Sequence, residues 1–144
     1  MEKIGAIRIR SIVRANAGVK AAVYALNLRK QNSCVILDKN PSVSGLLRKA
    51  ESVITYGELS KEVVSKLISK SAKRRGIKVE NVDAFTDSFF DGKAKLSDIG
   101  LKNLFRLHPP RGGFERKGKK KPFSVGGSVG YRRSAINDLL SRMM

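Results

Sequence analysis

The chain has 144 residues, which suit one compact domain with or without an extension and are too few for two full domains. Thirty Lys and Arg residues against 12 Asp and Glu residues give a formal charge of +18 at pH 7, an excess that indicates a polyanionic partner, with nucleic acid as the first choice. The single cysteine excludes an intramolecular disulfide and a Cys-rich zinc site, and no apolar run reaches the roughly 18 residues that span a bilayer, so we expect a cytosolic protein without a membrane partner.

The first 58 residues predict the order strand, helix, strand, helix, strand. In residues 3–13, Ile7 and Ile9 alternate with Arg8 and Arg10, which is typical of a half-buried strand with one charged face. A helix that Asn16 can cap follows within residues 15–31, then a strand from residue 33, a helix after the turn at 40–42, and a strand at 52–58. We therefore expect an α+β core, residues 1–58, with both helices on one face of a three-stranded sheet and the other face solvated or covered.

Residues 59–144 predict an extension packed on this core. Residues 59–76 form a strongly periodic helix, with Ser60 as its N-cap and Gly76 as its stop. Residues 77–107 show no sustained period, so we expect irregular structure with short extended pieces. Residues 108–130 form a basic loop, and apolar residues at helical spacing predict a last helix at 131–143.

The basic loop begins with "HPPRGGFERKGKKK", in which prolines fix the chain direction, glycines remove side chains and six cations can meet phosphates. Such a run is usually a solvated surface. Here the net charge, the turn residues and the interleaved Phe114 and Phe123 together favour a loop that lies along a polyanion. The two phenylalanines could stack on bases, but packing into the core is favoured. We expect residues 108–130 to be mobile in the free protein and fixed on RNA.

The loop before the first helix is a second candidate for phosphate binding. Arg10, Arg14 and Lys20 surround the start of that helix, where free backbone N–H groups favour an anion.

Residue types that would support catalysis or metal binding are scarce. The only cysteine, Cys34, lies in an apolar run that predicts a core position, and the only histidine, His108, lies in the basic loop. Acidic residues at steps of three or four could line a metal site or form a solvated surface, and without EF-hand spacing the surface is favoured; they are Glu80, Asp83, Asp87 and Asp91. P-loop and GxGxxG motifs are absent. We expect no enzymatic activity, cofactor, metal or small-molecule substrate.

Three segments resemble the archaeal type of the L-thirty family of large-subunit ribosomal proteins, whose eukaryotic relatives are named L-seven. They are the strand and helix run of residues 3–58, "FRLHPPRGGFERKG" and "GGSVGYRR", and "RLHPPRGG" is the most specific. The resemblance covers nearly the whole chain. It implies a ferredoxin-like two-layer fold whose three-stranded antiparallel sheet has the order 3-1-2. It also implies a cytoplasmic place in the large ribosomal subunit, bound to ribosomal RNA near five-S RNA and next to other ribosomal proteins.

Carried onto this sequence, the resemblance places the RNA-facing regions at residues 10–20 and 108–133. The candidate RNA-binding residues are Arg10, Ser11, Arg14, Asn16, Lys20, His108, Arg111, Gly112, Gly113, Phe114, Arg116, Lys117, Lys119, Lys120, Lys121, Arg132 and Arg133. We therefore expect a structural RNA-binding protein of the large ribosomal subunit. The alternative is a free basic protein that binds DNA or RNA nonspecifically, which the charge alone would permit.

Overall fold

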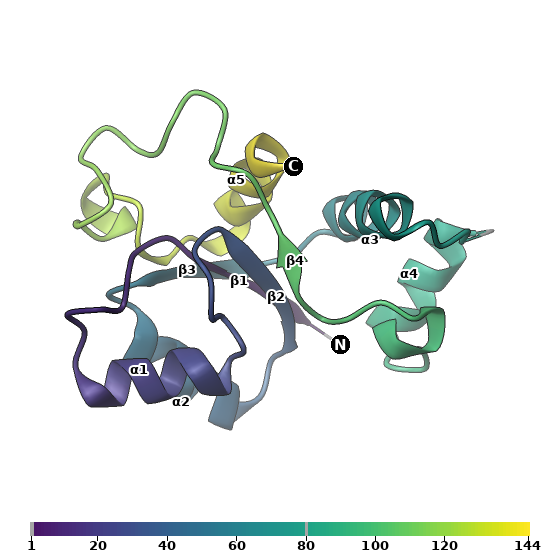
Figure 1. Ribbon diagram of the computed structural model, residues 1–144, viewed down its shortest axis with the longest axis horizontal. Helices are drawn as coiled ribbons and strands as arrows, with labels where there is room; N and C mark the ends of the chain where they lie inside the picture. The colour runs from purple at the N-terminus through teal and green to yellow at the C-terminus, as the bar shows by residue number, and fades with distance from the viewer. Residues whose placement is uncertain (1, 80) are drawn as a thin grey trace.

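The chain folds as a mixed α+β protein. A computed structural model describes residues 2–79 and 81–144 (Figure 1). The first half contains β1 (Lys3–Arg8), α1 (Ala17–Ala25), β2 (Ser33–Asp38), α2 (Pro41–Ala50) and β3 (Ile54–Glu58). The second half contains α3 (Lys61–Arg75), α4 (Val82–Phe90), β4 (Phe105–Arg106), β5 (Gly130–Tyr131), α5 (Ile136–Met143) and three 3-10 turns, η1 (Leu96–Ile99), η2 (Phe123–Val125) and η3 (Arg133–Ala135).

The sheet has five strands in the order β4-β2-β1-β3-β5. The central strand β1 runs antiparallel to β2 and β3, and β4 runs antiparallel to β2, whereas β5 runs parallel to β3. The prediction of a three-stranded antiparallel sheet was therefore wrong in the number of strands and in the direction of one edge strand, β5. Two-residue strands are too short to show the alternating pattern that identifies a strand in a sequence.

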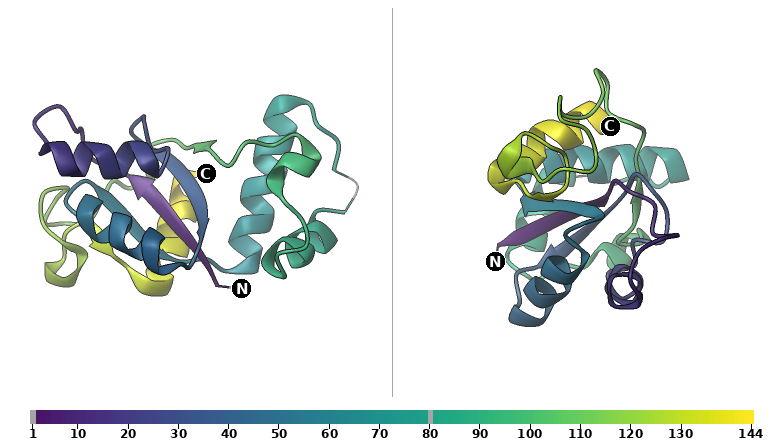
Figure 2. Two further views of the ribbon diagram at one scale, coloured as in Figure 1. Left: turned by 90° about the horizontal axis from the view of Figure 1, so that it is seen from below. Right: turned by 90° about the vertical axis from the view of Figure 1, so that its left-hand side faces the viewer.

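Both faces of the sheet are covered, so the layers number three where two were expected. As predicted, α1 and α2 share one face, where they pack on Ile4, Ala6, Val35 and Ile54 (Figure 2). The extension covers the other face, where buried residues of α3 and α5 form one hydrophobic cluster with Ile7, Cys34 and Ile36. The extension thus completes the core as well as carrying the basic loop.

The charged strand face that the sequence predicted for β1 is absent, because all six of its residues are buried. Arg8 is only 6% exposed. Its guanidinium donates to the carbonyl of Arg10 at 3.0 Å, to that of Leu28 at 3.2 Å and to that of Arg29. Burial lowers the pKa of Arg8. This arginine therefore ties together the loops that follow β1 and α1.

The expectation of short extended pieces in residues 77–107 is met only by β4, because most of the regular structure in this region is α4 and η1. Phe85 and Phe89 lie one turn apart on α4 with their rings stacked at 6.4 Å. Lys61 of α3 pairs with Asp87 at 2.5 Å, and Ser65 donates to Asp83 at 2.8 Å. The helical spacing of the phenylalanines was present in the sequence, but the acidic residues between them obscured it.

The last helix begins at Ile136 and not at the predicted residue 131. Tyr131 pairs with Tyr56 in the sheet, and the Arg132 amide donates to the Tyr56 carbonyl at 2.8 Å. Arg133 has a left-handed φ of 52°, which no α-helix continues through. By contrast, the helix predicted at 59–76 is present as α3; Ser60 takes the N-cap position without a side-chain capping hydrogen bond, and Gly76 ends the helix at a φ of 70°.

Candidate nucleic-acid interface

The strand directions bring four connecting segments to one end of the sheet. The register pairs Arg8 with Ile54, Ser33 with Arg106, and Thr55 with Gly130. The chain therefore leaves β1 and β4 at the same end at which it enters β2, β3 and β5. We call this the loop end, comprising residues 9–16, 26–32, 51–53 and 107–129. Both candidate regions of the sequence contribute to it.

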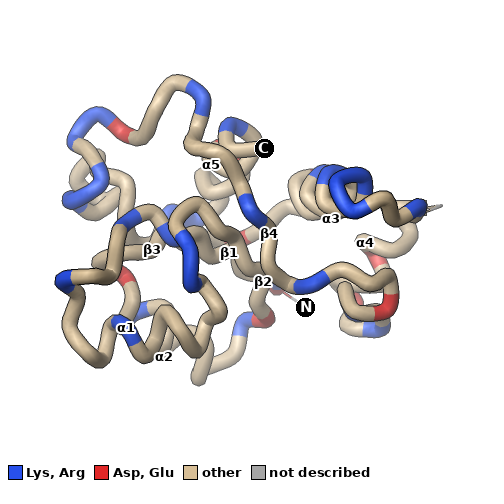
Figure 3. Tube along the Cα trace, in the orientation of Figure 1, with Lys and Arg blue, Asp and Glu red and all other residues tan. Residues whose placement is uncertain are grey.

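The loop end and the adjoining end of β4 carry a dense set of cations. Ten of these Lys and Arg residues are exposed, and none forms an ion pair with a residue that the structure describes. They are Arg14, Arg29, Lys30, Arg106, Arg111, Arg116, Lys117, Lys119, Lys120 and Lys121. The loop end contains only two acidic residues, Glu51 and Glu115. Figure 3 shows the cations distributed along the loops.

The opposite end of the sheet is close to electrically balanced. There Lys3 pairs with Asp38 at 2.6 Å, and Lys39 pairs with Glu2 at 2.5 Å. The two ends of the sheet thus differ in charge balance, and the loop end is a surface that attracts a polyanion.

The turn at residues 51–53 joins the two candidate regions. On one side, Arg10 donates from Nη1 to the Ser52 carbonyl at 2.9 Å, and its amide donates to the Val53 carbonyl at 3.1 Å. On the other side, the Glu51 side chain lies against Gly130, where a Cβ would come within 3.0 Å of Oε1. The structure therefore places residues 10–20 and the end of the basic loop around one turn.

The candidate residues of the first region are mostly accessible. Asn16 caps α1 as predicted, accepting from the Ala17 amide at 3.0 Å. The Ser11 hydroxyl accepts from the Val13 amide at 3.4 Å. Arg14 is exposed, and Lys20 is half-buried one turn into α1. No acidic residue occupies the first turn of α1, so its free N–H groups keep their positive potential.

The basic loop is anchored where it begins. The amides of His108 and Arg111 donate to the carbonyls of Met143 and Arg142, each at 3.0 Å, which fixes the loop to the end of α5. Gly112 and Gly113 then take φ values of 80° and 79°, the left-handed region that glycine adopts without strain. These glycines turn the chain so that Arg111 and His108 remain exposed.

The phenylalanines of the basic loop have partners within the protein. Phe114 packs against the cluster under α3 and α5, as predicted, and Lys119 Nζ lies 4.6 Å from its ring centroid. The Arg132 guanidinium carbon lies 4.6 Å from the centroid of Phe123, which is half-buried. Both rings thus serve to shape the loop.

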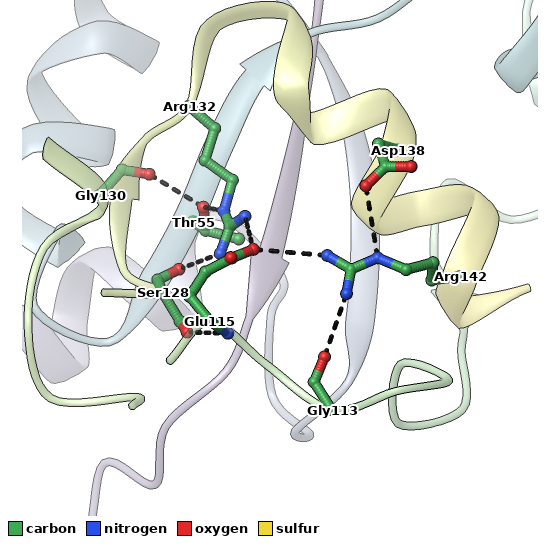
Figure 4. Close-up of polar contacts among 8 residues, drawn as sticks. All are labelled: Thr55, Gly113, Glu115, Ser128, Gly130, Arg132, Asp138 and Arg142. Atoms are coloured by element: carbon green, nitrogen blue, oxygen red, sulfur yellow. Dashed lines mark hydrogen bonds and ion pairs between the residues drawn. The ribbon is translucent and has the colours of Figure 1, made fainter. Parts of the chain in front are cut away.

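Arg132 differs most from its predicted role, because its side chain is only 1% exposed. Its Nε donates to Thr55 Oγ1 at 2.9 Å, its Nη2 to the Ser128 carbonyl at 3.0 Å, and its Nη1 to Glu115 at 2.9 Å (Figure 4). The guanidinium therefore faces the protein interior. Arg133 next to it is exposed. Sequence alone gave no sign of which of the two adjacent arginines would be buried.

Glu115 makes the stability of the protein depend on pH. Its hydrogen bond with Arg132, together with the charges of Arg132 and Arg142, holds the pKa of its carboxyl below the ordinary value. The unfolded chain then binds the proton more tightly, so this stabilisation is present above about pH 4.3 and is lost as the pH falls through the lower folded-state pKa. We expect Glu115→Gln to lower the free energy of unfolding at pH 6, and the difference from the natural protein to shrink toward pH 3. Urea unfolding at several pH values measures it, and a pH-independent difference would contradict the ion pair.

Cys34 is not a nucleophile. Its thiol is fully buried in the core, and burial raises its pKa to about 12, so the reactive thiolate is negligible at neutral pH. The predicted core role of Cys34 is confirmed.

The acidic residues of α4 do not form a metal site with the neighbours that the structure describes. Asp83 and Asp87 are engaged by α3, Asp91 lies 4.0 Å from Lys93, and Glu80 falls outside the described residues. Within residues 2–79 and 81–144, no group of three or more His, Cys, Asp or Glu side chains could hold a metal ion. Over the same residues, no helix combines the length and the apolarity needed to cross a bilayer.

The sequence model of the family described as Ribosomal protein L30p/L7e matches residues 4–54. The chain is 39% identical to the large ribosomal subunit protein uL30 of Methanococcus vannielii, with 96% of this chain and 97% of the relative covered. It is 38% identical to uL30 of Methanopyrus kandleri, covering 94% and 100%, and 39% identical to uL30 of Sulfolobus acidocaldarius, covering 99% of both. The chain belongs to the L30p/L7e family of ribosomal proteins.

Proposed function

We propose that this protein is a structural constituent of the large ribosomal subunit that binds ribosomal RNA through its loop end. Its relatives are named as proteins of that subunit, and membership of a ribosomal protein family makes it a structural component and not an enzyme. The observation that carries the RNA-binding role is the exposed set of unpaired cations at and beside the loop end.

Binding of this kind requires correctly placed positive charges but no catalysed reaction. Exposed lysines and arginines neutralise phosphates, while the anchored backbone determines which arrangement of RNA strands fits between them. Residues 10–20 and the basic loop would contact separate RNA segments on either side of the turn at 51–53. In this proposal Arg132 and Phe114 shape the loop, and the exposed candidate residues face RNA.

The partners in this proposal are large-subunit ribosomal RNA, in the neighbourhood of five-S RNA, and adjacent ribosomal proteins. The family resemblance supports that neighbourhood. The separation of the cations into two regions supports contact with more than one RNA segment.

A competition experiment tests this function. The protein is bound to labelled fragments of large-subunit ribosomal RNA and challenged with excess duplex DNA at 0.15 M salt. We expect one fragment to be retained, because the anchored loops select RNA shape as well as charge. Equal displacement by DNA and by unrelated RNA would favour a nonspecific nucleic-acid binder. Sedimentation of salt-washed ribosomal subunits, followed by mass spectrometry, shows independently whether the protein stays with the large subunit.

A further inference from the structure

Glu115 lies within the most basic segment of the chain, where a negative charge opposes phosphate binding. We propose that Glu115 is a positioning residue that orders the phosphate-binding loop before RNA arrives. This inference rests on the proposed RNA-binding function and adds to it the means by which the loop acquires its shape.

Glu115 is held by two arginines from different elements. Its Oε1 accepts from Arg132 Nη1 at 2.9 Å and from Arg142 Nη2 at 3.3 Å (Figure 4). Arg132 follows β5, and Arg142 lies in the last turn of α5. A single carboxylate oxygen therefore connects the loop to the sheet and to the terminal helix. We call Glu115, Arg132 and Arg142 the clasp.

The inner half of the clasp is rigid because Arg132 is buried. Its remaining donors are fixed by Thr55 of β3 and by the Ser128 carbonyl, and Thr55 itself donates to the Gly130 carbonyl at 2.9 Å. Charge-assisted bonds to a buried guanidinium are stronger and more directional than exposed ion pairs. Glu115 is thus attached to the framework of the sheet.

The backbone on either side of the carboxylate is fixed as well. The Glu115 amide donates to Ser128 Oγ at 3.2 Å, and Arg142 Nη1 donates to the Gly113 carbonyl at 3.2 Å. Arg142 Nε also lies 3.3 Å from Asp138 Oδ2, an ion pair within α5 (Figure 4). Residues 113–115 therefore have a defined place before any RNA is present.

The cationic run of residues 116–121 extends directly from this anchor. At its far end the Lys121 carbonyl accepts from the Ser128 amide at 3.0 Å, and within it the Lys117 amide donates to Gly126 at 3.3 Å. The run is thus a short closed loop fixed at both ends. Fixing it in the free protein moves the entropic cost of ordering from binding to folding. This inference replaces the expectation that residues 108–130 are mobile until RNA binds.

The test depends on whether the RNA affinity of one variant rises or falls. Glu115→Gln raises the net charge by one, so charge alone would strengthen RNA binding, whereas loss of the clasp weakens it. We expect about tenfold weaker binding to the retained ribosomal RNA fragment, as when only about a tenth of the free loops keep the binding conformation. The slope of log K against log salt should not change, because every cation remains. Trypsin should cleave the free variant faster within residues 116–121.

The matched control is Glu51→Gln. Glu51 is the other acidic residue of the loop end; it is exposed, whereas Glu115 is half-buried, and it forms no ion pair within residues 2–79 and 81–144. Its replacement changes the charge equally, so we expect unchanged or tighter binding and unchanged cleavage. Glu115→Asp keeps the charge and shortens the side chain, and we expect it to behave like Glu115→Gln. Circular dichroism of each variant verifies that the fold is retained.

Binding by Glu115→Gln as tight as that of Glu51→Gln, together with cleavage at the natural rate, would overturn the inference. Cleavage of the free protein needs no RNA, so it tests the ordering of the loop even if the RNA-binding proposal fails.

Discussion

Replacing Lys117, Lys119, Lys120 and Lys121 together by Gln is expected to weaken binding to ribosomal RNA by about 100-fold at 0.1 M salt. All four are exposed at the loop end, and each phosphate contact that is lost lowers the magnitude of the slope of log K against log salt by about 0.7 to 0.9. The slope should therefore fall by about 3. Filter binding or fluorescence anisotropy between 0.05 and about 0.3 M salt measures both quantities.

The control variant must lower the net charge by the same four units, at positions outside the loop end. Four exposed lysines outside the loop end serve this purpose, one in α3 and three between α3 and β4, and they are Lys66, Lys78, Lys93 and Lys102. Their replacement lowers the net charge by the same four units, and we expect a loss of affinity below tenfold with little change in slope. Equal losses in the two variants would mean that the protein binds through its overall field and not through the loop end.

The part of the fold from β1 to α3 was predictable because its elements are long and periodic. Leu47 and Ala50 mark the buried side of α2, and Val64, Leu67 and Ile68 mark that of α3. Each stripe extends over at least one full turn, so a few misleading residues do not hide it. The same elements determine the end of the sheet at which the two candidate regions meet.

The second half depends on contacts between residues that are distant in the sequence. The two residues of β5 form a strand only because β3 lies beside them. The two strands are far apart in the sequence, since Thr55 and Gly130, which are in contact, are 75 positions apart. Arg132 and Arg133 are chemically identical neighbours, yet one is buried and the other exposed. No local pattern distinguishes them, since the burial of Arg132 follows from Thr55, Glu115 and Ser128 together. The clasp was for this reason beyond prediction from the sequence, whereas the charge that it organises was not.

Gly57→Ala is expected to cost about 3 kcal/mol in the free energy of unfolding. Gly57 lies in β3 beneath the backbone of η3, and a Cβ at this position would overlap the carbonyl oxygen of Arg133 and lie 3.1 Å from the Cβ of Ile136. Arg133 already holds a left-handed φ of 52°, so its backbone has little freedom to move away. The added methyl group would therefore push the start of α5 off the sheet.

A second glycine separates this steric effect from the general effect of the substitution. Gly45 lies in α2, and a Cβ there would meet nothing within 4 Å. Alanine is favoured over glycine inside a helix by about 0.5 to 1 kcal/mol, so Gly45→Ala is expected to stabilise the protein. Urea unfolding of both variants measures the two changes. Similar stabilities would show that η3 does not pack closely on β3.

The Gly57 variant also tests whether the packing of α5 on the sheet keeps the basic loop ordered. Arg132 and Arg142 lie on either side of η3 and the start of α5, so a shift there would pull both arginines away from Glu115. We expect Gly57→Ala to increase tryptic cleavage within residues 116–121, as Glu115→Gln does, although it removes no charge and touches no residue of the loop. Combining the two substitutions should then add little further cleavage, because residues that act through one network are not additive. Full additivity would mean that the packing of α5 and the clasp order the loop independently.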